Sequence, residues 1–204
     1  YLETREAIDN TAEAQLQLGL LETYVSENSS FQANQVAGLK ALGAQINADV
    51  YKTQYSEYVW EDPAALKSRE DATDKHMDDL QALHDAKRPV LDDHVAREQH
   101  KDRLRIRAAG HADSHSGLVE WYNEKEAYLT ARPAIESVAE AQLQLSGFAN
   151  YEGEKQMVTD TTVAQLKADG ASINADVYKT QYSEYVWEDP AALQSRESDI
   201  DSKW

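Results

Sequence analysis

The chain has 204 residues and a formal net charge of −17, which excludes general affinity for nucleic acid or for an anionic membrane surface. It has no cysteine, 8 glycines and 4 prolines, which excludes disulfides and zinc–thiolate sites and disfavours a loop-rich or all-β fold. The scarcity of glycine and proline leads us to expect an all-α protein. No apolar run approaches the roughly 20 residues of a membrane span, and the opening YLETREAIDN is no signal peptide. We therefore expect a cytoplasmic protein without membrane insertion.

The chain contains an internal duplication. Residues 1–77 align without a gap with residues 128–204, at a constant offset of 127, and 46 of the 77 positions are identical. The stretch NADVYKTQYSEYVWEDPAAL occurs in both copies, at Asn47–Leu66 and at Asn174–Leu193. Identity of this extent indicates a tandem repeat of one structural unit. Each copy carries a net charge of −7, so the two copies repel each other.

The first part of each copy has helical periodicity. Apolar residues recur at three- and four-residue steps in AEAQLQL (Ala12–Leu18) and in IESVAEAQLQL (Ile135–Leu145), which predicts amphipathic helices. The pattern is interrupted at Thr23–Ser30 and at Phe148–Asp160, where we expect a kink or a short loop. Later in the second copy a narrow seam resumes, of the kind that coiled coils use. Its members are Leu166, Gly170, Ile173 and Val177.

An aromatic stripe follows in each copy. Its residues recur at helical spacing, so we interpret them as one face of a helix that closes the end of a bundle or contacts a partner rod. A base-stacking platform is disfavoured, because the surrounding negative charge would repel phosphate. The candidate interface residues are Tyr51, Tyr55, Tyr58 and Trp60, with their copies Tyr178, Tyr182, Tyr185 and Trp187.

A long helix is predicted after the first stripe. Asp62 and Pro63 form a good helix start, since Asp caps free N–H groups and Pro suits the first position. Helical composition then continues to Arg132, with only Pro89 and Gly110 as weak points, over about 105 Å at ~1.5 Å per residue. No single globular core surrounds such a helix. We therefore expect tandem three-helix bundles joined by it, with repeat 1 at 1–108 and repeat 2 at 109–204.

Three motifs resemble the spectrin-repeat superfamily, and within it the rod of α-actinin. WYNEKEAYL (Trp121–Leu129) is similar to the first helix of a repeat, and IDSKW (Ile200–Trp204) is similar to the third. DDHVAREQHKDRLR (Asp92–Arg105) resembles the segment that joins successive α-actinin repeats. The resemblance implies left-handed coiled-coil bundles with Trp121 and Trp204 in the core, and with Met77 where the second copy has Trp204. It also implies truncation of the first helix of repeat 1 and of the third helix of repeat 2.

The resemblance implies a structural function. Rods of this family form antiparallel homodimers and hold actin-binding heads at a set distance in the cytoskeleton. Actin filaments would be reached only through domains that have no counterpart in this sequence, and the same holds for calcium-binding domains. An alternative within the superfamily is an adaptor that binds a signalling protein or a membrane-receptor tail without dimerising.

Enzymatic and metal-binding functions are disfavoured. His111 and His115 lie one helical turn apart, but Ala112 replaces the glutamate of the metalloprotease motif, and no third ligand has a useful spacing. The basic stretch Arg97–Arg107 invites a phosphoinositide head group or an acidic partner, although an exposed helix face with mixed charges explains it more simply. A helical enzyme would need a concave pocket with converging polar groups. We therefore expect no catalytic residues, no cofactor and no metal.

Overall fold

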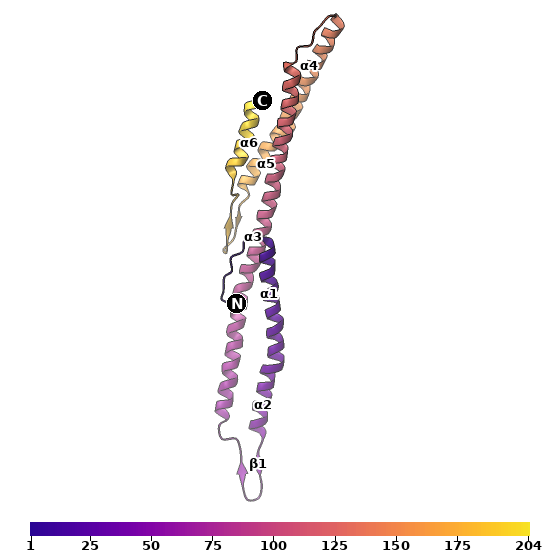
Figure 1. Cartoon of the computed structure of the whole chain (residues 1–204). Helices are drawn as coiled ribbons and strands as arrows, with labels where there is room; N and C mark the ends of the chain where they lie inside the picture. Colours follow the sequence, from indigo (N-terminus) through magenta and orange to yellow (C-terminus); the bar gives the residue numbers. More distant parts are fainter. The chain divides into compact units, whose positions relative to one another are not determined.

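Most residues lie in helices, and the four short strands form two hairpins. The computed structural model describes residues 1–204 (Figure 1). The all-α class predicted from the sequence is therefore confirmed. In chain order the elements are α1 (Thr11–Phe31), the π-helical turn η1 (Gln32–Val36), α2 (Ala37–Ala48), β1 (Tyr51–Lys52), β2 (Glu57–Tyr58), α3 (Pro63–Thr130), α4 (Val138–Val158), the π-helical turn η2 (Thr159–Val163), α5 (Ala164–Ala175), β3 (Tyr178–Lys179), β4 (Glu184–Tyr185) and α6 (Pro190–Lys203).

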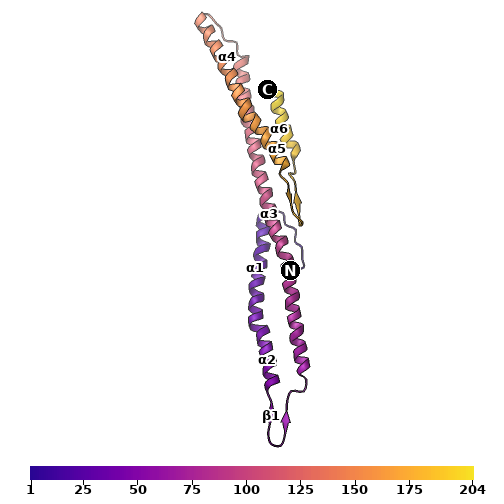
Figure 2. The same ribbon diagram turned by 180° about the vertical axis from the view of Figure 1, so that it is seen from behind.

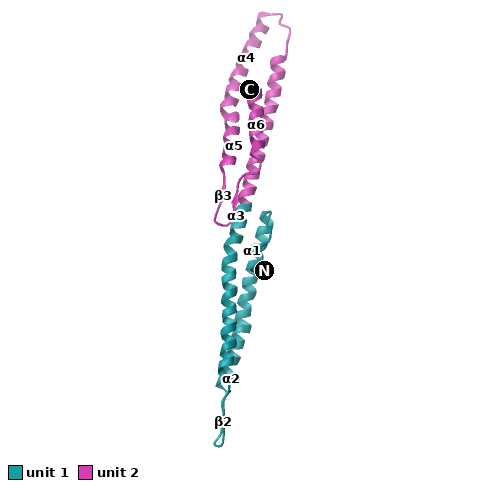
Figure 3. Cartoon of the chain, turned by 90° about the vertical axis from the view of Figure 1, so that its left-hand side faces the viewer, with its two compact units in different colours: residues 1–98 teal, residues 99–204 magenta.

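The chain divides into two compact units, residues 1–98 and residues 99–204 (Figure 3). Helix α3 contributes its first part to unit 1 and its second part to unit 2. The repeat boundary predicted after residue 108 also lies within α3. Each unit therefore contains one copy of the duplicated sequence packed against its own part of this helix.

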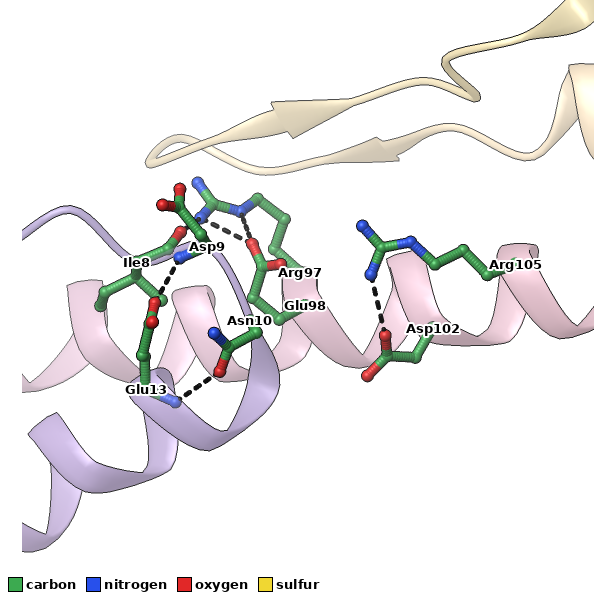
Figure 4. Close-up of polar contacts among 8 residues, drawn as sticks. All are labelled: Ile8, Asp9, Asn10, Glu13, Arg97, Glu98, Asp102 and Arg105. Carbon is green, nitrogen blue, oxygen red and sulfur yellow. Dashed lines mark hydrogen bonds and ion pairs between the residues drawn. The ribbon is translucent and has the colours of Figure 1, made fainter.

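In unit 1, α1 and α2 run alongside the first part of α3, as both Figure 1 and Figure 2 show. The N-terminal segment is hydrogen-bonded to α3 by two cationic side chains, the buried Lys87 and the partly buried Arg97. The Arg97 guanidinium donates to the carbonyl of Ile8 at 3.1 Å, and Lys87 Nζ donates to the carbonyl of Thr4 at 3.2 Å. Asn10 then caps α1 by accepting from Glu13 N at 2.9 Å (Figure 4). The apolar core consists of Ile8, Ala14, Leu21 and Leu91, flanked by Leu2, Leu18, Tyr24 and Val95.

In unit 2, the second part of α3 packs against α5 and α6. Helix α4 begins with a capping box, in which Ser137 and Glu140 each accept from the other's backbone N–H. Two buried clusters follow along the bundle. The first contains Leu104, Ala108, Ile173, Tyr185 and Leu193, and the second contains Leu118, Val163, Leu166 and Ile200.

The predicted start of α3 is confirmed, and the duplicated sequence forms the same cap at the start of α6. Asp62 Oδ1 accepts from Ala65 N at 2.9 Å, and Asp189 Oδ1 accepts from Ala192 N at 3.0 Å. Helix α3 then continues from Pro63 to Thr130 through the internal Pro89. The long helix expected from the sequence is therefore confirmed, and it ends at Thr130.

The expected breaks at Thr23–Ser30 and Phe148–Asp160 are wrong. Helix α1 passes through the first segment and continues through η1 into α2, while α4 passes through nearly all of the second and continues through η2 into α5. Ser, Asn and Gly weaken an exposed helix by only ~1 kcal/mol or less per residue, which is not enough to end it when the other faces pack. The irregularity takes the form of a π-helical turn in each copy: η1 begins just after Ser30, and η2 begins at Thr159, at the end of the expected segment.

The helical interpretation of the aromatic stripes is also wrong, because both stripes lie in β-hairpins. Tyr51 pairs with Tyr58 in one hairpin, and Tyr178 pairs with Tyr185 in the other. Within each stripe the tyrosines recur at four- and three-residue steps, as on a helix, but the aromatic and β-branched residues and the threonine of the turn favour a hairpin. We call β1–β2 hairpin 1 and β3–β4 hairpin 2.

The same threonine fixes the turn of each hairpin. Thr53 Oγ1 accepts from the backbone N of Tyr55 at 3.2 Å and of Ser56 at 3.1 Å. Its copy Thr180 accepts in the same way from Tyr182 and Ser183. Such hydroxyl-to-backbone bonds favour a turn over continued helix. The duplicated sequence therefore specifies the same local conformation twice.

Candidate interaction surface

In unit 2, α3 covers hairpin 2 and the neighbouring faces of α5 and α6. Leu104 and Ala108 pack against Ile173, Tyr185 and Leu193, and Leu104, Ile173 and Leu193 have no exposed surface at all. Tyr178 and Trp187 lie at the edge of the same cluster. We call the residues that α3 contacts here the covered face. It consists of Leu166, Ile173, Tyr178, Tyr185, Trp187 and Leu193.

Charged contacts surround this apolar cluster. Arg107 donates to Asp176 Oδ2 at 2.7 Å and to Ser172 Oγ at 2.7 Å, both at the end of α5. One turn before Leu104, the ring of His100 lies 5.6 Å from that of Tyr178. These contacts fix the register of α3 against hairpin 2, because a one-turn slip would separate the guanidinium from its carboxylate.

His111 lies at the centre of the same interface. Its side chain is buried, and its Nε2 lies 3.5 Å from Glu197 Oε1, while its Nδ1 has no hydrogen-bond partner. Burial lowers the pKa of His111 below its ordinary value, although the Glu197 carboxylate opposes this shift. The imidazole is therefore neutral at pH 7. A Cβ on Gly170 would lie 1.9 Å from Glu197 Oε1, so glycine is what lets that carboxylate reach His111.

The residues of α3 that make this interface form a coiled-coil seam. They recur at alternating steps of four and three residues, which is the spacing of core positions in a heptad repeat. Two of the five are histidines, and each faces a carboxylate of α6, since His115 Nε2 lies 2.9 Å from Asp199 Oδ2. The seam consists of Leu104, Ala108, His111, His115 and Leu118.

In unit 1 the copy of the covered face is not covered. Leu39 is 42% exposed where its counterpart Leu166 is 1% exposed, and Tyr58 is 50% exposed where Tyr185 is 8% exposed. Trp60 is 42% exposed, and Tyr51 of hairpin 1 is 60% exposed. We call this surface the open face. It consists of Leu39, Ile46, Tyr51, Tyr58, Trp60 and Leu66.

The open face also carries two carboxylates, and one of them, Glu70, interacts electrostatically with Lys67 of the same helix. Asp49 is the copy of Asp176, and Glu70 is the copy of Glu197. Glu70 Oε1 lies over Gly43, where a Cβ would approach to 2.1 Å, so it keeps the arrangement seen in unit 2. Neither carboxylate makes a hydrogen bond or an ion pair within unit 1. Cations on a covering helix would find both acceptors already in place.

The candidate interface residues therefore differ in exposure between the two hairpins. Tyr185 is buried inside unit 2, with Lys101 Nζ 5.2 Å from its ring centroid, and Tyr178 and Trp187 are half-buried beside it. Tyr182, at the turn of hairpin 2, remains exposed. In hairpin 1 all the candidates are exposed, namely Tyr51, Tyr55, Tyr58 and Trp60.

The structure brings Trp121 and Trp204 together in unit 2. Their rings stack at 5.0 Å, Tyr151 stacks on Trp121 at 6.3 Å, and Trp204 Nε1 donates to Thr159 Oγ1 at 2.6 Å. Both tryptophans are half-buried and line an open cavity of about 280 Å³ together with Lys125. This aromatic cluster lies where α6 ends, and α3 and α4 continue beyond it.

Met77 is half-buried in unit 1, at the position that Trp204 occupies in unit 2. It lines an open cavity of about 650 Å³ with Val36 and with the ion pair of Lys40 and Asp74, at 2.7 Å. The smaller side chain has no aromatic neighbour there, so unit 1 lacks the stacked cluster of unit 2.

The histidines and the basic stretch have structural partners. No group of three or more His, Asp or Glu side chains is placed to hold a metal ion. Within the basic stretch, Arg97 binds the carbonyl of Ile8, and Arg105 pairs with Asp102 at 3.1 Å (Figure 4). These side chains are committed to contacts inside their own units.

Sequence reasoning missed the covering residues His100, Arg107 and His111. The signal was present, because Leu104, Ala108, His111, His115 and Leu118 follow the four-and-three spacing of a seam. The histidines obscured it, since a polarity-based reading places them on a solvated surface. Their partners on α5 and α6 become visible only once the chain is folded.

Comparisons with protein-family models, with characterised proteins and with solved structures give no significant match. No helix combines the length and the apolar character needed to cross a membrane.

Proposed function

We propose that the chain is a structural interaction module of the spectrin-repeat type, from a rod of the α-actinin family. Its two units would be tandem three-helix bundles, and its role would be to act as a spacer and an antiparallel dimerisation module in a cytoskeletal cross-linker. Actin would be bound by other domains of such a protein. The location would be cytoplasmic, at the cytoskeleton.

One observation carries this proposal: a single helix enters the cores of both units. Leu91 of α3 lies in the core of unit 1, and Leu104 of the same helix lies in the core of unit 2. Between them α3 continues without a loop. A helix that is packed on both sides of the junction resists bending, which is the property that a spacer needs.

The remaining chemistry supports a structural function over a catalytic one. The buried histidine His111 contacts Glu197 from a packed seam, not from a concave site. The open cavity beside Trp121 is lined mainly by aromatic rings and lysine side chains. Such surfaces suit contact with other proteins better than the positioning of a small substrate.

Sedimentation equilibrium tests the dimerisation part. We expect a dimer whose association is unchanged or stronger in high salt, because each copy of the repeat carries −7 and salt screens that repulsion. Fluorophores near Tyr1 and near Trp204 should approach each other between partners if the pair is antiparallel. A monomer at high micromolar concentration would contradict the proposal.

A monomer would favour the adaptor function, for which the open face is the specific supporting observation. Tyr51 and Tyr58 are both at least 50% exposed on hairpin 1, and Tyr55 is 89% exposed at its turn. Aromatic residues exposed together are typical of protein-binding surfaces.

A further inference from the structure

The turn of each hairpin carries an exposed tyrosine, Tyr55 in hairpin 1 and Tyr182 in hairpin 2. Tyr55 is 89% exposed, more than any other large hydrophobic side chain of the protein. Tyr182 is still 43% exposed, although Tyr185 of the same hairpin is buried against α3. The exposure of the turn tyrosine therefore does not require an uncovered hairpin.

The turn does not need an aromatic side chain at this position. Gln54 and Tyr55 are the central residues of a turn that is closed by a hydrogen bond from Thr53 N to Ser56 O at 2.8 Å. Tyr55 contributes its backbone N–H, which donates to Thr53 Oγ1 at 3.2 Å, and any residue except proline carries that group. Small polar residues and glycine are usual in turns. The exposed phenol is therefore a feature that the fold itself does not explain.

The other candidate hydroxyl groups are less accessible. Thr53 Oγ1 accepts two backbone N–H groups of the turn and lies 3.4 Å from Ser56 Oγ. In hairpin 2, Tyr185 is buried and Tyr178 is half-buried beside it. Tyr182 is thus the tyrosine of hairpin 2 that an enzyme can reach without moving α3.

We propose that Tyr182 and its copy Tyr55 are acceptor sites for phosphoryl transfer from ATP by a tyrosine kinase. The phenolic Oη attacks the γ-phosphorus, the bond from that phosphorus to the bridging oxygen breaks, and ADP leaves. The phenolic proton passes to the carboxylate base of the kinase. The product carries about two negative charges at pH 7. The proposal does not depend on the proposed dimer, which is measured by mass.

The charges around the turn define the class of kinase. The segment Asn174–Leu193 contains four acidic residues and a single cation, Lys179. Lys179 Nζ is itself paired with Glu184 at 2.5 Å. A kinase with a basic substrate groove would attract such a segment. The hairpin can adapt to a groove, because its ladder has only two residue pairs and short two-stranded hairpins are marginally stable.

Phosphorylation would create a binding site on the hairpin. The hairpin contains no arginine, and its one lysine already pairs with a glutamate, as Lys52 pairs with Glu57 at 2.6 Å in the other copy. The phosphate oxygens would therefore stay available to a partner. A phosphotyrosine-recognition domain with clustered arginines would bind them through charge-assisted hydrogen bonds.

The test compares the full chain with the free peptide Asn174–Leu193, in the presence of ATP and Mg²⁺. The enzyme is a purified tyrosine kinase domain, chosen because it phosphorylates every tyrosine of the peptide. Trypsin cleavage after Lys179 separates Tyr178 from Tyr182 and Tyr185, and fragment masses distinguish the two copies because Lys67 follows one and Gln194 the other. For each tyrosine the rate in the chain is divided by its rate in the peptide, which removes the sequence preference of the kinase.

We expect this ratio to be at least about tenfold higher for Tyr182 than for Tyr178 and Tyr185, because the latter two react only after local opening. The ratio for Tyr55 should be at least as high as that for Tyr182. Equal ratios for the three tyrosines of hairpin 2 would overturn the proposal, because the kinase would then be acting on unfolded chain. A ratio for Tyr182 as low as that for Tyr185 would also overturn it.

Two variants separate the site from the fold. Tyr182→Phe should remove most of the phosphate incorporated into hairpin 2 and leave the melting temperature unchanged, since it deletes only an exposed hydroxyl. Tyr178→Phe is the matched control, and it should leave that incorporation within about twofold, because a half-buried tyrosine reacts only after local opening. Circular dichroism of the phosphorylated chain should show the helix content of the parent. A large loss of helix on phosphorylation would contradict the assignment of the turn as a modification site that the fold tolerates.

Discussion

Hairpin 1 and hairpin 2 have one sequence and two environments. Both pair their first and last tyrosines in the same register, and both use a threonine to hold the turn. Yet Tyr185 is buried and Tyr58 is half exposed. Local sequence therefore determines the conformation of this segment, whereas burial is determined by whether α3 lies on it.

The opposite contrast occurs at the other end of the two copies. In unit 1, Ala14 and Leu21 are fully buried against Leu91 of α3. Their counterparts in unit 2, Ala141 and Phe148, are partly or largely exposed and line an open cavity of about 440 Å³. Unit 1 is thus tightly packed around Ala14 and Leu21, where unit 2 is open. Unit 2 is tightly packed around hairpin 2, where unit 1 is open.

The largest expected difference follows from truncating one leucine in each copy. Leu193→Ala should destabilise unit 2 by about 2–5 kcal/mol, because this side chain has no exposed surface and a cavity would remain. The identical change in the other copy, Leu66→Ala, should cost about 1 kcal/mol or less, since Leu66 is only half-buried. Urea unfolding followed by circular dichroism measures both. Equal losses would show that the two environments do not differ in solution.

The next largest difference in stability is expected for alanine substitutions of Gly170 and Gly43, which contact the carboxylates of Glu197 and Glu70. Gly170→Ala should cost about 1–3 kcal/mol, because the new methyl group displaces Glu197 toward a packed His111. Gly43→Ala should be neutral or stabilising by up to about 1 kcal/mol, because Glu70 can swing into solvent and alanine favours the helix. Thermal unfolding of the two variants beside the parent chain checks this. A more harmful Gly43→Ala would contradict the account.

Acidification should weaken unit 2 through His111. Its folded-state pKa is lowered by burial, so the unfolded chain binds the proton more readily than the fold does. The resulting stability is fully present above the ordinary histidine pKa of about 6.5 and is lost as the pH falls below it. His111→Gln should flatten this pH dependence when unfolding is measured between about pH 7 and pH 5.

Three charged groups near His111 also influence its protonation. The carboxylates of Glu197 and Asp169 favour its protonated form, while Arg196 opposes it. Glu197→Gln should therefore deepen the loss of stability at low pH, because the imidazolium would lose its nearest anion. An unchanged pH profile in both variants would exclude His111 as the titrating group.

The smallest expected effect concerns the ion pair at the base of hairpin 2. Arg107→Ala should cost about 0.5–1 kcal/mol, since the pair with Asp176 is partly exposed and screened. Arg105→Ala is the control, because its pair with Asp102 lies on the surface of one helix and contributes about 0.5 kcal/mol or less. Raising the salt concentration should reduce the difference in unfolding free energy between the two variants. A larger difference at high salt would contradict the assignment to these ion pairs.

The sequence predicted most of the helices correctly, but it did not predict which of their residues are buried. Capping residues and composition predict α3 correctly from Pro63 onward, because these signals are local. The breaks expected near Thr23 and Phe148 fail because packing of the other helix faces outweighs a few weak helix formers. The four- and three-residue spacing of the tyrosines was taken for a helix, whereas the aromatic and β-branched composition of the segment favours strands.

Burial could not be predicted from the duplicated sequence at all. Ile46 and Ile173 are both followed by the identical stretch and differ in the three preceding residues only in Gln45 against Ser172, so no local hydrophobic pattern distinguishes the half-buried residue from the buried one. The difference arises from His100, Leu104 and Ala108, which lie far away in the chain. This non-local information also decides which tyrosines are free to meet a partner.

The most direct test of the central claim uses the absence of cysteine from the chain. Leu39→Cys and Leu166→Cys introduce one thiol each, at equivalent positions of the open and covered faces, and circular dichroism confirms that both variants remain folded. Under native conditions the thiol at position 39 should react with a small maleimide nearly as fast as a free thiol. The thiol at position 166 should react slower by about a hundredfold or more, since it is reached only by local opening. Equal rates at the two positions would show that α3 does not cover one copy selectively, and would contradict the account.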